Sequence, residues 1–204
     1  MAPKGNVERG DWFADLDAEL EEKTQNIIKD VEELNAQRGK VNRTLIEDLA
    51  RIQARFGKID VHLTMEPAKN VFSEPTSIPE KYAMREDFDY AGVKNIQLVD
   101  RTQEQGRMGD SLKVWYYNDE LTMRLRMVFE YCEGEHYYKY AGWKRMFGQF
   151  VIYDSPLGEV DMDELHEALG EVVKAWYESH LRRNREQLIS ALKERFEKGE
   201  TFTE

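Results

Sequence analysis

The chain has 204 residues, of which 34% are charged and 41% hydrophobic, and its formal net charge is −11. This length fits one large domain, or one domain with a helical appendage. Because an acidic chain repels phosphate, the charge argues against broad binding of nucleic acid or of anionic membranes.

Three features predict a cytoplasmic protein without a membrane segment. Cys132 is the only cysteine, so no disulfide can form within the chain, and this suits a reducing compartment. No apolar run approaches the roughly 18 residues that a membrane helix needs. The first residues lack the apolar core of a signal peptide, and we expect residues 1–10 to be disordered.

Residues 11–57 are predicted to form a helical arm that begins with a helix over residues 12–37. Polar residues interrupt the second seam that a coiled coil needs, so the pattern favours packing against a neighbouring helix or sheet over a long parallel zipper. A self-association surface is the alternative. One apolar stripe with a seven-residue spacing marks this helix: Phe13, Leu20, Ile27, Leu34 and Val41.

A second helix is predicted to begin at Thr44, where Glu47 completes a capping box, and to end at Gly57. The break near Gly39 allows the two helices to form a hairpin. A single kinked rod is the other possibility that the sequence leaves open.

Residues 58–204 are predicted to hold an antiparallel sheet and a long C-terminal helix. Short turn-like links at residues 118–120 and 133–134 make neighbouring strands antiparallel, so residues 111–154 are expected to form a meander. A long connection is expected over residues 66–93. The strands, identified by their alternating apolar residues, are expected at about 59–65, 94–100, 111–118, 121–132, 135–141 and 144–154.

The closing helix is predicted to begin near Asp161 and either to run to about residue 198 or to bend near Asn184. A helical pair, a meander of five to six strands and a long helix make an α+β fold. This order resembles the helix-grip arrangement, in which a curved sheet wraps a long C-terminal helix around an apolar cavity. Here the strand that precedes the two helices of that arrangement is missing, and the first helix is longer.

The second face of the predicted sheet is the candidate binding surface. Tyr, Trp and Arg are enriched at interaction hot spots because they combine a large contact area with directed polar groups. Arginines can also stack on aromatic rings. A helix or the long loop covering this face is the alternative. The candidate binding residues are Trp115, Tyr117, Arg124, Arg126, Tyr137 and Lys139.

No catalytic, nucleotide or metal motif stands out, so the sequence predicts neither a cofactor nor a metal site. The four histidines lack metal-ligand spacing. For an enzyme, the only titratable candidates are His136 with Glu130 or Glu135. The basic residues at 182–185 alternate with acidic neighbours, which is typical of a solvated helix rather than a nucleic-acid site.

Two functions remain open at the level of sequence. The first is a non-enzymatic interaction or scaffold protein that self-associates, using the helical arm and the aromatic–arginine face of the sheet. The second is a small-molecule binding module of helix-grip-like architecture, with an apolar cavity on which an enzyme could be built. The residues expected to line that cavity are Met123, Met127, Phe129, Tyr138 and Trp176.

Overall fold

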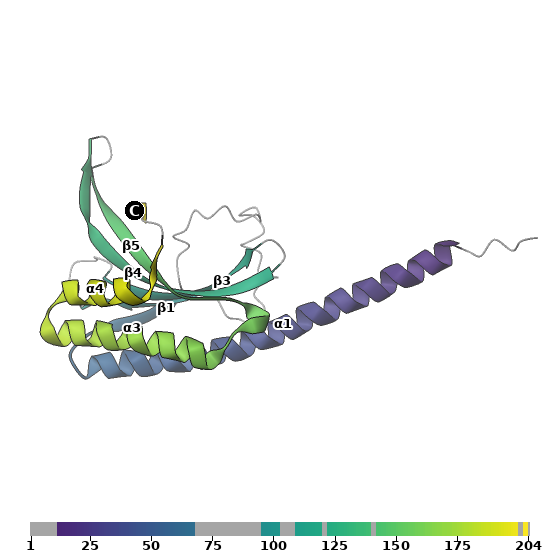
Figure 1. Ribbon diagram of the computed structural model, residues 1–204, viewed down its shortest axis with the longest axis horizontal. Helices are drawn as coiled ribbons and strands as arrows, with labels where there is room; N and C mark the ends of the chain where they lie inside the picture. The colour runs from purple at the N-terminus through teal and green to yellow at the C-terminus, as the bar shows by residue number, and fades with distance from the viewer. Residues whose placement is uncertain are drawn as a thin grey trace, which may run out of the picture.

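A computed structural model describes residues 12–67, 95–102, 109–119, 122–139, 142–199 and 202–203. Within these ranges the chain is a helix, a run of strands and then two further helices, which confirms the α+β class. The helices lie on one side of a twisted sheet, and the first of them extends far beyond it (Figure 1). Residues 1–10, most of the connection 66–93 and residues 103–108 fall outside the described ranges.

The first helix, α1, is a single element that spans Trp12–Gly57. The predicted helical pair is therefore one rod, which is the alternative that the sequence left open. Gly39 lies inside the helix, where a glycine costs only about 1 kcal/mol relative to alanine. No proline interrupts this region, so the helix can continue through it. Packing of the following turns on the sheet outweighs the cost of the glycine.

The C-terminal half of α1 packs against the rest of the molecule. Leu49 is 1% exposed and Phe56 is fully buried, whereas the side chains over residues 12–33 are exposed. Figure 1 shows the corresponding geometry, in which the N-terminal half of α1 projects away from the sheet. The buried side chains of α1 are Arg38, Val41, Asn42, Leu45, Leu49, Ile52 and Phe56.

The sheet is an antiparallel meander in which consecutive strands are neighbours from β1 to β6, and β7 also pairs with β5. The strands are β1 (Leu63–Pro67), β2 (Ile96–Asp100), β3 (Ser111–Asp119), β4 (Thr122–Tyr138), β5 (Gly142–Pro156), β6 (Glu197–Lys198) and β7 (Phe202–Thr203). The long β4–β5 hairpin carries the longest run of paired residues.

The predicted turn at Glu133 and Gly134 is wrong. Strand β4 runs through these residues, so the two strands predicted at 121–132 and 135–141 are one. The register against β5 shifts between Cys132 and Gly134, which marks a bulge. A bulge accommodates one extra residue without ending the strand. The same dipeptide can therefore serve a turn or a bulge, and the long partner strand β5 favours the bulge here.

Helix α3 (Met162–Arg182) closes the core. Its predicted N-cap is confirmed, since the Asp161 side chain accepts hydrogen bonds from the backbone N–H groups of residues 163 and 164. Trp176 is fully buried, and its ring lies 5.0 Å from that of Phe56 on α1 and 5.2 Å from that of Phe129 on β4. These three rings join the first helix, the sheet and the closing helix.

The closing helix bends near Asn184, which was one of the two alternatives that the sequence left open. Arg183 adopts a left-handed conformation with φ of 51°, and the Asn184 side chain then caps α4 (Arg185–Arg195). A short 3-10 turn, η3 (Leu157–Glu159), joins β5 to α3. Among the helices that the structure describes, none is long and apolar enough to cross a membrane.

Candidate functional site

The strand register brings four of the six predicted binding residues together. Trp115 on β3 lies opposite Arg126 on β4, and Tyr117 lies opposite Arg124. These positions alternate with buried core residues of the same strands, so their side chains lie on the face turned away from Trp176. The predicted face assignment of β3 and β4 therefore agrees with the structure.

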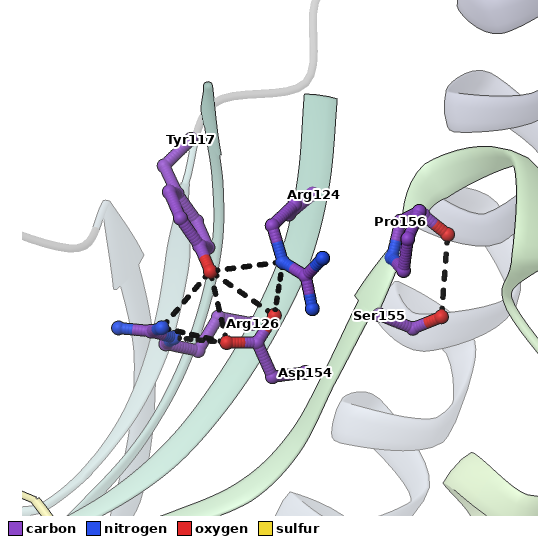
Figure 2. Close-up of polar contacts among 6 residues, drawn as sticks. All are labelled: Tyr117, Arg124, Arg126, Asp154, Ser155 and Pro156. Carbon is purple, nitrogen blue, oxygen red and sulfur yellow. Dashed lines mark hydrogen bonds and ion pairs between the residues drawn. The ribbon is translucent and has the colours of Figure 1, made fainter. Parts of the chain in front are cut away.

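A carboxylate from the next strand organises three of these side chains. Asp154 on β5 accepts hydrogen bonds from Arg124 Nε at 2.8 Å and from Arg126 Nε at 2.7 Å. The Tyr117 hydroxyl donates to Asp154 at 2.9 Å and accepts from both arginines. Figure 2 shows all three side chains converging on this carboxylate. We call Tyr117, Arg124, Arg126 and Asp154 the Asp154 cluster.

Electrostatics keep the Asp154 cluster in one protonation state at neutral pH. Burial raises the pKa of Asp154, but hydrogen bonds from the two arginines outweigh it and hold this pKa below its usual value. Burial and the bond to Asp154 raise the pKa of Tyr117. The cluster thus contains two guanidinium groups, one carboxylate and a neutral phenol. The guanidinium of Arg126 also lies 4.6 Å from the centre of the Tyr117 ring.

Sequence reasoning missed Asp154 because its partners depend on the β4–β5 register. That register shifts between Met127 and Val128, where β5 carries an extra residue. A carboxylate on the strand after two same-face arginines was the available signal. It becomes specific only when the position of the bulge is known.

Tyr137 and Lys139 lie apart from the other predicted binding residues. Tyr137 is eleven residues beyond Arg126 along β4, a distance of roughly 36 Å at strand rise. Both side chains are exposed, at the end of the β4–β5 hairpin. The six predicted residues thus form two separate surfaces rather than one site.

A buried ion pair lies further along the same face. Lys113 Nζ is 2.5 Å from Glu130 Oε2, and both side chains are almost fully buried. The hydroxyl of Ser111 lies 3.5 Å from the other carboxylate oxygen. Strand alternation places these positions on the face opposite the core, but it gives no indication that they are excluded from water. A buried pair of this kind joins β3 to β4, and its desolvation offsets much of its attraction.

His166 and His180 each contact a carboxylate. His180 Nε2 lies 3.2 Å from Asp100, and His166 Nε2 lies 2.8 Å from Asp48. These contacts link α3 to the sheet and to α1. In the described ranges, no group of three His, Cys, Asp or Glu side chains could hold a metal ion. The side chains of His136 and Glu135 fall outside the described ones, so the predicted acid–base candidates cannot be placed together.

The core where the sequence predicted a ligand cavity is filled by side chains. Met127, Phe129 and Trp176 are fully buried and belong to one hydrophobic cluster. A hollow of about 250 Å³ lies elsewhere, along residues 151–155 of β5. A second hollow of about 10 Å³ lies between α1 and β3. Neither hollow is lined by the residues expected for the cavity.

The exposed half of α1 carries the most extensive apolar surface among the described helices. We call residues 12–37 the distal half. Trp12 is 67% exposed, Ile27 is 62% and Phe13 is 55%. The distal stripe, defined by its shared position on the helix, consists of Phe13, Leu16, Leu20, Ile27, Val31 and Leu34.

The distal stripe continues a surface that is buried elsewhere in the same helix. Each helical residue advances by about 100°, so the distal stripe and the buried residues from Val41 to Phe56 fall within one arc of about 100°. The sheet and α3 cover this arc in the second half of α1 only. The distal half therefore presents to solvent the same kind of apolar face that its other half uses for packing.

Comparisons of the chain with protein-family models, with curated proteins and with solved structures found no match.

Proposed function

We propose that the protein is a non-enzymatic interaction protein, a scaffold that self-associates through the distal stripe of α1. The observation that carries this proposal is the continuous apolar arc, which is covered in one half of the helix and exposed in the other. Contiguous exposed apolar surface on a soluble domain is typical of interaction sites. A second copy of the same helix supplies a complementary apolar face.

The energetics of the distal half support a partner. Complete burial of a Leu, Ile, Val or Phe side chain stabilises by roughly 1.5–3 kcal/mol. The stripe residues Leu20 and Ile27 are 51% and 62% exposed, so each has roughly half of that stabilisation still to gain. An amphipathic helix in water gains most of its stability from the packing of its apolar face. Pairing would therefore stabilise the distal half as well as the assembly.

The Asp154 cluster is a second proposed contact surface. It presents an aromatic ring and two guanidinium groups, and each of its side chains is partly exposed. Because the mutual hydrogen bonds hold these groups in one arrangement, little side-chain freedom would be lost on binding. The sequence predicted that the protein uses this aromatic–arginine face together with the helical arm.

The alternative function, a small-molecule binding module, has the hollow along β5 in its favour. Its volume of about 250 Å³ is slightly below the common range of ligand pockets, about 300–1,000 Å³. Three carboxylates line it, from Asp154, Glu164 and Glu197. Asp154 is already paired with Arg124 and Arg126, so Glu164 and Glu197 are the carboxylates that would suit a small cationic molecule, rather than the apolar ligand expected from the sequence.

Sedimentation velocity of the full chain over a concentration series tests the proposed self-association. We expect the wild type to form an oligomer and the variant Leu20→Glu/Ile27→Glu to be a monomer, because charges in the stripe cannot be buried in an apolar interface. Both positions are exposed, so the unfolding midpoint of the variant monomer should stay close to that of dissociated wild type.

The matched control is Ala18→Glu/Gln25→Glu. It adds the same charge at the same seven-residue spacing, but on the opposite side of the helix. This control should assemble like the wild type. A wild type that stays monomeric at high concentration, or a stripe variant that assembles normally, would refute the proposal.

A further inference from the structure

We infer that the second copy pairs antiparallel, with Leu20 of one distal half packed against Ile27 of the other. This inference rests on the proposed self-association and adds the orientation and the register of the partner helix. Three observations carry it: the position of the sheet relative to the stripe, the spacing of the apolar residues, and the distribution of charge along α1.

The position of the sheet excludes a parallel pair of straight helices. From Val41 onward, the arc that continues the distal stripe is covered by the sheet and α3 of the same copy. Packed helices lie 8–10 Å apart. If two parallel α1 helices faced each other along the stripe, the sheet and α3 of both copies would have to fit in the narrow space between the C-terminal halves of the two helices. In an antiparallel pair the bodies lie at opposite ends (Figure 1 shows the body at one end of α1).

The apolar spacing selects a register for the antiparallel pair. If Leu20 of one copy lies opposite Ile27 of the other, then Leu16 lies opposite Val31 and Phe13 lies opposite Leu34. Each of these three apolar layers occurs twice by symmetry. The overlap from residue 13 to residue 34 is roughly 32 Å long. The overlap ends just before Arg38, the first residue of α1 that is buried against the rest of its own copy.

The charge distribution favours the same orientation. Residues 15–22 contain five carboxylates and no basic side chain. A parallel pair would place this segment against its own copy. In the antiparallel register the segment runs alongside residues 25–32, whose net charge is only −1, and Lys29 on the far side of that segment pairs with Glu33 of its own helix. Like charges held at close range destabilise an association, so the antiparallel arrangement carries the smaller repulsion.

Disulfide cross-linking of the full chain tests the orientation. In a Cys132→Ser background, Leu16→Cys and Val31→Cys are prepared with tags of different length, then mixed and oxidised. We expect the mixed Leu16→Cys/Val31→Cys disulfide, and loss of cross-linking when either variant is oxidised alone. In the antiparallel pair the two copies of residue 16 lie roughly 22 Å apart, whereas a disulfide needs Cα atoms within about 7 Å.

The control variant is Glu22→Cys, which is exposed on the opposite side of the helix and should not cross-link. A dominant homodisulfide of Leu16→Cys would overturn the antiparallel orientation and leave self-association intact. If sedimentation shows an oligomer but no stripe position cross-links, the interface lies elsewhere, and both the orientation and the proposed role of the distal stripe are wrong. A monomer by sedimentation would also overturn both.

Discussion

Asp154 joins three strands through one carboxylate. Its oxygens accept from arginines on β4 and from the Tyr117 hydroxyl on β3, and the side chain is only 18% exposed. Hydrogen bonds to a charged group in such an environment contribute more than bonds between neutral groups. The cluster therefore stabilises the sheet whether or not a partner contacts it.

At the residue scale, Asp154→Asn should lower the free energy of unfolding by about 1–2 kcal/mol at neutral pH. The amide keeps one acceptor but leaves two guanidinium groups without their counterion. Because the folded pKa of Asp154 is depressed, its stabilisation is complete above the unfolded pKa of about 3.9. It disappears as the pH falls through the folded pKa.

Urea unfolding between neutral and strongly acidic pH measures this effect. The difference between wild type and Asp154→Asn should close in the acidic range, and the exposed control Glu194→Gln should differ little from wild type throughout. A stability difference that persists once the wild-type carboxylate is protonated would contradict the electrostatic explanation.

Alternation of residue type was sufficient to place single residues on the correct face, but not to find their partners. Leu125, Met127 and Phe129 are buried on one face, and Arg124 and Arg126 lie on the other, the face to which the sequence assigned them. The contact with Asp154 depends on a register shift in β5. The burial of Lys113 depends on what packs over that face. Neither property is encoded in the local period of the strand.

At the scale of elements, local signals were reliable only where tertiary packing agreed with them. The Asp161 cap and the bend at Asn184 occur where the sequence placed them. Gly39 failed to end a helix because the following turns are buried on the sheet. Gly134 produced a bulge instead of a turn because β4 continues to pair with β5 beyond it. Helix and strand boundaries at glycine depend on the whole fold, which a local pattern does not contain.

At the scale of a single helix, the N-cap of α4 contributes a measurable part of the stability. The Asn184 side chain accepts a hydrogen bond from the backbone N–H of Gln187. Asn184→Ala should therefore cost about 1 kcal/mol of stability. Since Leu188 and Leu192 on this helix are buried in the core, loss of the cap should also weaken their packing.

Thermal and chemical unfolding of Asn184→Ala measure this cost. Ser190→Ala is the matched control, because the side chain is exposed in the middle of the same helix. The control should be neutral or slightly stabilising, since alanine is the better helix former. Equal stabilities for Asn184→Ala and wild type would show that the cap does not hold the bend.

At the scale of the whole molecule, α1 has two unequal halves. One half is part of the hydrophobic core, and the other projects from it with its apolar stripe in water. The sequence identified the stripe, but it could not show which part of the stripe the sheet and α3 cover. That distinction depends on where the sheet ends relative to the helix, and it is the basis of the proposed self-association.

Hydrogen exchange of the distal half measures whether the apolar stripe has a partner in a second copy. An unpaired helix that makes no tertiary contacts opens readily, so its amides exchange fast. We predict that amides over residues 16–34 exchange slowly at high protein concentration and faster on dilution, while those over residues 45–56 stay protected throughout. Fast exchange of residues 16–34 at every concentration would show that the distal stripe has no partner in a second copy, and the proposed self-association would be wrong.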